Sequence, residues 1–131
     1  MPSDCPCNSG LLYDACCKPL HDGAEARDVL ALMRSRYAAY ALGKAEYIQR
    51  TTHPKSPYFE KNRERWTAGI LEFCRTTEFC RLFIFGYGPT HVYFATQLKQ
   101  NGESFTLTEN SRFEQIDGRW LYLDGEVARG T

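Results

Sequence analysis

The sequence predicts an α+β protein in which about three helices pack on one face of a curved antiparallel sheet, preceded by a short cysteine-rich segment. Three observations support this fold class. Apolar residues recur at three-to-four spacing in the first half of the chain, they alternate in the second half, and the cysteines gather at the start. The 131 residues suffice for one hydrophobic core with a small appendage. We therefore expect an appendage over residues 1–24 and one domain over residues 25–131.

The first half of the domain contains three helical patterns. Residues 25–43 predict a helix that ends at Gly43, since glycine readily adopts the left-handed conformation that terminates helices. Residues 44–50 predict a second helix, which the prolines of "HPKSP" end. Residues 58–73 predict a third. Its expected buried side consists of Trp66, Ile70 and Phe73.

Alternating patterns follow. In "EFCRLFIFGYG" both faces are apolar, so we expect a central strand. The pairs Asn101-Gly102 and Asp117-Gly118 separate the next alternating runs and predict type I′ hairpins. Three consecutive strands are thereby joined into an antiparallel meander, which gives the helices a sheet to cover.

Composition and charge exclude several functions. Sixteen basic residues balance sixteen acidic ones, so a dedicated nucleic-acid binder is not expected. The chain contains no apolar run of membrane-spanning length, and "MPSDCPC" lacks the basic and apolar regions of a secretory signal. We therefore expect a cytoplasmic protein without a membrane partner. In that reducing compartment, clustered cysteines favour metal binding over disulfides.

The cysteine cluster predicts a metal site. "CPCNSGLLYDACC" places Cys5, Cys7, Cys16 and Cys17 around a turn signal at residues 8–10, which can bring the two pairs together. Four thiolates without an open position are the ligands of a structural zinc ion, which can fold a segment too short to fold alone. We expect His21 to lie on the surface rather than to replace Cys17.

The same residues resemble a known module. The pattern Cys-x-Cys, eight residues, Cys-Cys is similar to the SEC-C zinc motif. Four further blocks, "LMRSRYAAY", "YIQRTTHP", "ENSRF" and "WLYLDG", resemble, in that order, the bacterial YchJ-like family. The resemblance implies an N-terminal zinc knuckle on a cone-shaped, nuclear-transport-factor-2-like domain. It implies no established activity, and it leaves open the pairing of two copies through the sheet.

One face of the predicted meander carries an acidic residue among apolar ones. Alternation places on this face Phe105, Leu107, Glu109, Ser111 and Phe113. If the face is inward, the Glu109 carboxylate needs a partner, because burial of a lone charge is costly. The candidate partners are Arg34, Arg36 and His53.

Two interpretations of this group stay open. In a catalytic pocket, Glu109 or His53 would act as general acid or base, and Tyr37 or Tyr122 would donate hydrogen bonds. In a structural arrangement, an ion pair between Arg36 and Glu109 would lock a helix to the sheet, and His53 would bind backbone at a helix end.

The sequence thus supports competing functions. The favoured one is a zinc-binding interaction module, in which the knuckle contacts a protein partner and the cone is a scaffold or binds a small apolar ligand. The alternative is an enzyme of isomerase, dehydratase or hydrolase type, which rests on fold analogy alone. Zinc-ejecting redox sensing is a third hypothesis.

Overall fold

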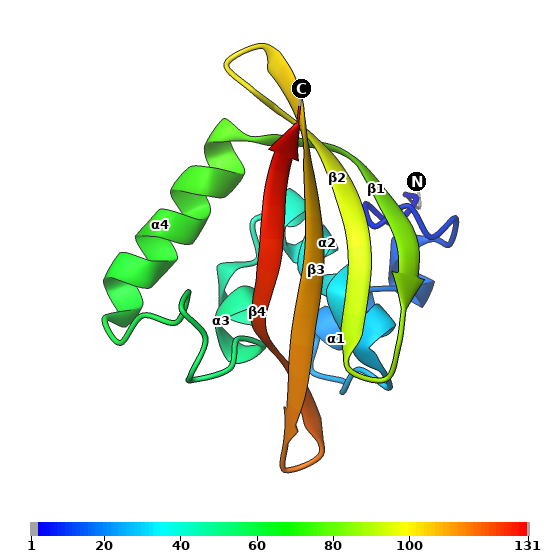
Figure 1. Cartoon of the computed structure of the whole chain (residues 1–131), viewed down its shortest axis with the longest axis vertical. Helices are drawn as coiled ribbons and strands as arrows, with labels where there is room; N and C mark the ends of the chain where they lie inside the picture. The colour runs from blue at the N-terminus through cyan, green and yellow to red at the C-terminus, as the bar shows by residue number, and fades with distance from the viewer. Residues whose placement is uncertain (1–2, 131) are drawn as a thin grey trace.

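The computed structural model describes residues 3–130 and confirms the predicted α+β class (Figure 1). Its elements, in chain order, are η1 (Tyr13–Ala15), α1 (Lys18–His21), α2 (Val29–Leu42), α3 (Ala45–Arg50), α4 (Arg63–Thr76), β1 (Glu78–Tyr87), β2 (His91–Gln100), β3 (Glu103–Ile116) and β4 (Arg119–Gly130). The strands form one antiparallel sheet in the order β1-β2-β3-β4. We call residues 3–24 the knuckle and the remaining described residues the cone.

Capping side chains set the helix boundaries. The Asp28 carboxylate accepts a hydrogen bond from the Ala31 amide at 2.8 Å, so α2 begins later than the apolar pattern predicted. It ends at Gly43, where φ is 74°, as expected. In α4 the Asn62 side chain caps the amide of Arg65 at 3.0 Å, which shifts this helix toward the C-terminus relative to the predicted 58–73.

The two hairpins follow the prediction. Asn101 and Gly102 have φ angles of 52° and 79°, and Asp117 and Gly118 have φ angles of 52° and 80°. Positive φ at both central residues is the requirement of a type I′ turn, whose twist matches that of the flanking strands. These turns connect β2 to β3 and β3 to β4 in register.

The position of β1 corrects the sequence-based prediction, because β1 is an edge strand and not a central one. Leu82 faces the core, whereas Phe85 on the opposite face is 57% exposed. Side chains on that outer face shield one another from water. The ring centroids of Phe85 and Tyr93 lie 5.2 Å apart, and the Arg81 guanidinium lies over the ring of Phe83. An apolar pattern on both faces therefore did not require burial on both.

Two groups of buried residues support the cone. One lies between the sheet and α2 and includes Leu32, Val92 and Phe113. The other joins α4 to α2 and α3 through Trp66 and Ile70. Figure 1 shows α2 behind the sheet and α4 standing to one side of it. Within residues 3–130, no helix is long and apolar enough to cross a membrane.

Candidate functional site

The four N-terminal cysteines converge on one point. Their Sγ atoms all lie within 4.8 Å of one another. The Sγ atoms of Cys7 and Cys16 are 3.6 Å apart, and those of Cys16 and Cys17 are 3.8 Å apart. Four Zn–S bonds of about 2.3 Å in a tetrahedron separate their sulfurs by about 3.8 Å. The same distances are far too long for disulfides, and these cysteines are all free. The donor set and its spacing fit a tetrahedral metal ion.

The local backbone brings the two cysteine pairs together. Positive φ angles at Asn8 (62°) and Gly10 (88°) reverse the chain, as the turn signal predicted. The arms then pair: the amide of Cys5 donates to the carbonyl of Leu11 at 2.9 Å. After this turn, η1 leads directly into α1, which positions Cys16 and Cys17 opposite the first pair.

The knuckle is part of the core of the cone. Cys5, Cys7 and Cys17 are buried and belong to the same hydrophobic cluster as Val29 of α2 and Leu82 of β1. The four cysteines therefore contribute to the packing of the whole domain. Unfolding of the knuckle would expose apolar surface of α2 and β1.

Without a cation, the cluster accommodates charge poorly. The hydrogen bond from the Cys17 thiol stabilises the Cys7 thiolate and lowers the pKa of Cys7 to about 4. Burial raises the pKa of Cys5 to about 11, and the interaction with Cys7 raises the pKa of Cys17. The neighbouring thiols thus stabilise a single negative charge, on Cys7. A bound divalent cation would let the other thiols ionise as well.

Polar groups outside the four cysteines also contact the cluster. The Ser9 hydroxyl lies 3.2 Å from Cys16 Sγ. The Arg34 guanidinium donates to the Cys7 carbonyl at 2.8 Å and lies 3.9 Å from Cys7 Sγ. Arg34 was a predicted partner of Glu109, but it points to the knuckle instead. Arg34 and Arg36 are two positions apart and so project from different sides of α2.

His21 is neither a surface residue nor placed as a metal ligand. Its Nε2 donates to the Ser35 carbonyl at 2.8 Å, and its Nδ1 accepts from the Tyr13 hydroxyl at 2.7 Å. Burial lowers the pKa of His21, which favours the neutral ring that these donor and acceptor roles require. The imidazole therefore connects the knuckle to α2.

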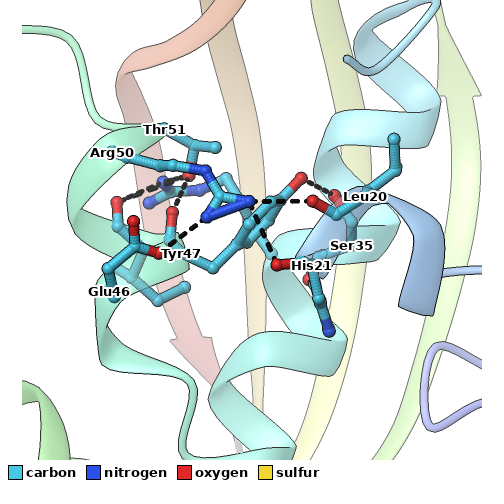
Figure 2. A network of polar contacts seen from close by, with 9 residues as sticks. Leu20, His21, Ser35, Glu46, Tyr47, Arg50 and Thr51 are labelled. Carbon is cyan, nitrogen blue, oxygen red and sulfur yellow. Dashed lines mark hydrogen bonds and ion pairs between the residues drawn. The ribbon is translucent and has the colours of Figure 1, made fainter. Parts of the chain in front are cut away.

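Arg50 fastens the knuckle to α3, as Figure 2 shows. Its Nη2 donates to the carbonyls of Leu20 and His21 at 2.9 and 3.2 Å, which satisfies the C-terminus of α1. The guanidinium also lies 4.6 Å over the ring of Tyr47 and pairs with Glu46. The Tyr47 hydroxyl in turn meets Ser35 at 2.6 Å. These contacts fix α1 against two helices of the cone.

A second candidate site is a cavity of about 580 Å³ between the sheet and α4. Four of the five residues predicted as pocket candidates line it: Arg36, Tyr37, Glu109 and Tyr122. Its other walls come from both hydrophobic clusters, with Phe94 of β2 and Trp66 of α4 as examples. The volume lies within the range of small-molecule sites.

Hydrogen bonds hold Glu109 at the wall of this cavity. Its Oε2 accepts from the Tyr122 hydroxyl at 2.7 Å and from the Ser111 hydroxyl. A side chain at position 125 would overlap this carboxylate, so Gly125 leaves the space that it occupies. The carboxylate is half-buried, and burial of Tyr122, together with its interaction with this carboxylate, raises the pKa of the tyrosine.

The predicted direct ion pair between Arg36 and Glu109 is not formed. Arg36 Nη1 donates to Thr51, to Thr52 and to the Ile48 carbonyl, at distances of 2.8 to 3.2 Å. Its guanidinium lies 4.7 Å over the ring of Tyr122. Arg36 finds its acceptors on α3 and on the two residues that follow this helix, so it does not need the Glu109 carboxylate. Tyr122 lies between the two groups and contacts both.

His53 does not line the cavity with the other candidates. Its Nδ1 accepts from the Lys55 amide at 3.0 Å, and its Nε2 donates to the Glu114 carboxylate at 2.8 Å. The imidazole is buried, and Glu114 is exposed. The ring therefore holds the segment after α3 against β3, which agrees with the backbone-binding role weighed from the sequence.

Comparisons with known proteins agree with this architecture. Residues 28–125 match the family model described as YchJ, middle NTF2-like domain. A UPF0225 protein of Deinococcus radiodurans is 42% identical over 122 residues, which cover 92% of this chain and 86% of that protein.

Two solved structures of SEC-C motif containing proteins are also similar. The one from Rhodopseudomonas palustris has a TM-score of 0.76 and 32% identity, covering 96% of this chain and 98% of that chain. The one from Psychrobacter arcticus has a TM-score of 0.72 and 25% identity, covering 97% and 84%. On the family match, the close relative and the shared fold, this chain belongs to the YchJ-like family, which has an NTF2-like middle domain.

Proposed function

We propose that this protein is a zinc-binding protein whose knuckle contacts a protein partner and whose cone binds a small, largely apolar ligand. The observation that carries the proposal is the convergence of four sulfurs within 4.8 Å at tetrahedral spacing. Zinc favours such thiolate sets, and a set of four leaves no coordination position for substrate. The metal would therefore be structural.

Exposed apolar residues on the knuckle support the proposal that it binds a protein partner. Leu11 and Leu12 are 54% and 45% exposed, next to the turn that holds the cluster. Asn8, on the same turn, accepts a hydrogen bond from the Leu82 amide of β1 at 2.7 Å. Because the turn is tied to the sheet, its leucines form a small fixed apolar surface, which lowers the entropic cost of binding.

Metal analysis tests the zinc proposal. Protein purified without added metal is analysed by mass spectrometry, and its reactive thiols are counted. We expect one zinc ion per chain. Only the two cysteines outside the cluster, Cys74 on α4 and Cys80 on β1, should react with a thiol reagent. A metal-free protein with all six thiols reactive would contradict it.

The partner is tested separately with zinc retained. A Leu11→Ser/Leu12→Ser variant should keep its zinc and lose a partner that co-purifies with the unaltered protein. The matched control is Leu71→Ser, which changes an exposed leucine of α4. Equal capture by all three proteins would remove the knuckle as the contact surface.

A further inference from the structure

The cavity wall carries an acidic group with no basic partner. Among residues 3–130, no lysine, arginine or histidine nitrogen lies within 4.0 Å of the Glu109 carboxylate. Both hydrogen bonds that Glu109 accepts end on Oε2. Its Oε1 accepts none from the described part of the chain. A half-buried carboxylate with one free oxygen is a site for a hydrogen-bond donor, and a charged donor gives the stronger bond.

Within the described lining of the cavity, the one basic residue already donates hydrogen bonds to other groups. The described lining contains three residues with an acidic or basic side chain: Arg36, Glu60 and Glu109. Arg36 is buried, its Nη1 serves three acceptors, and its guanidinium is stacked on Tyr122. Glu60 pairs with the Arg65 guanidinium at 3.7 Å, so Glu109 is the acidic side chain of the described lining that has no basic partner, and it favours a cation over an anion.

The remaining walls suit the apolar body of such a cation. They are largely aromatic and include Tyr40, Trp66, Phe73, Phe79, Phe94 and Phe113. Aromatic faces attract ammonium groups and accept apolar carbon.

We propose that the cavity binds a small hydrophobic amine in its protonated form, with the ammonium on Glu109 and the apolar body between α4 and the sheet. The proposal rests on the proposed ligand-binding function of the cone and names the class of ligand. Gly125 serves the same site, since a larger residue would displace the carboxylate. The preference for a cation is set by Glu109 and not by the shape of the cavity.

Three compounds of similar size separate charge from shape: phenethylamine, phenethyl alcohol and hydrocinnamate. Calorimetric titration of the full-length, metal-loaded protein at neutral pH should rank the amine at least about tenfold tighter than the alcohol. Hydrocinnamate should bind more weakly than both. The Glu109→Gln variant should lose most of the amine's advantage and change the affinity for the alcohol less than about twofold.

Glu126→Gln is the matched control. Glu126 is exposed and precedes Val127, which pairs with Glu109 and lines the cavity, so Glu126 faces away from it. This variant should bind all three compounds as the unaltered protein does. If Glu109→Gln does not fold, Gly125→Ala provides a second route, because it moves the same carboxylate and should reduce the amine's advantage.

The outcomes separate the two proposals. Equal affinities for the three compounds, or an amine preference that survives Glu109→Gln, would overturn the inference and leave the proposed ligand-binding function in place. Binding of none of the three would overturn both. A preference for hydrocinnamate would overturn the inference and assign the site to Arg36.

Discussion

The knuckle and the cavity adjoin the same sheet, and they are built in opposite ways. At the knuckle, buried cysteines fill the space between α2 and β1. At the cavity, α4 packs on α2 and α3, and an open space of about 580 Å³ remains between α4 and the sheet. Apolar packing and satisfied polar groups make the first region a core. In the second, Glu109 Oε1 accepts no hydrogen bond from the described residues, which a packed core would avoid.

Loss of the cluster should have the largest effect on stability. Cys7→Ser removes a fully buried thiol of the proposed zinc site, and loss of a structural metal is among the changes that cost more than about 3 kcal/mol. Because the knuckle shares its core with the cone, we expect a lower free energy of unfolding for the whole domain, measured by urea denaturation followed by circular dichroism.

Cys80→Ser is the control for this change, since Cys80 is exposed on β1, and it should alter stability by less than about 0.5 kcal/mol. If Cys7→Ser released zinc while the cone kept its full stability, the knuckle would be an independent appendage and the shared core would carry no energy.

Release of the knuckle from α3 should have an intermediate effect. Arg50→Ala removes the donors to the Leu20 and His21 carbonyls and the contact with Tyr47, at a cost of about 1–2 kcal/mol. We also expect zinc to pass to a chromophoric chelator several-fold faster, because the segment that follows the cysteines is loosened.

Arg75→Ala is matched to it, because Arg75 pairs with Glu72 on the exposed surface of α4, where such pairs contribute little. Equal chelation rates in the two variants would mean that the cysteine cluster holds its metal without help from α3.

The smallest effect on stability is expected at the cavity. A Cβ at position 125 would overlap the Glu109 carboxylate, which must then leave the Tyr122 hydroxyl. We expect Gly125→Ala to lower the free energy of unfolding by about 1 kcal/mol in urea, since the displaced carboxylate loses its hydrogen bond from the Tyr122 hydroxyl. Gly86→Ala, whose Cβ would meet nothing within 4 Å, should change it less. A loss as large as that of Cys7→Ser would make Glu109 a structural residue.

Local patterns were sufficient to predict several parts of this protein. The pairs Asn101-Gly102 and Asp117-Gly118 determined two hairpins, because few residues adopt positive φ without strain. Gly43 ended α2 for the same reason. Alternation on β3 placed Glu109 on the inner face, and the spacing of the cysteines predicted a convergent cluster. Each of these features depends on neighbours in the chain.

Other features were decided by contacts between distant segments. Whether β1 lies at the edge of the sheet depends on which strands pair with it, and whether its faces are covered depends on which segments pack on the sheet; its own sequence specifies neither. The partners of Arg34, Arg36 and His21 depend on which carbonyls and hydroxyls reach them from the knuckle and α3. The sequence by itself determined most of the elements, the two hairpin turns and the cysteine cluster. Only the tertiary structure decided which polar groups satisfy one another and which, like Glu109 Oε1, accept no hydrogen bond from the described residues.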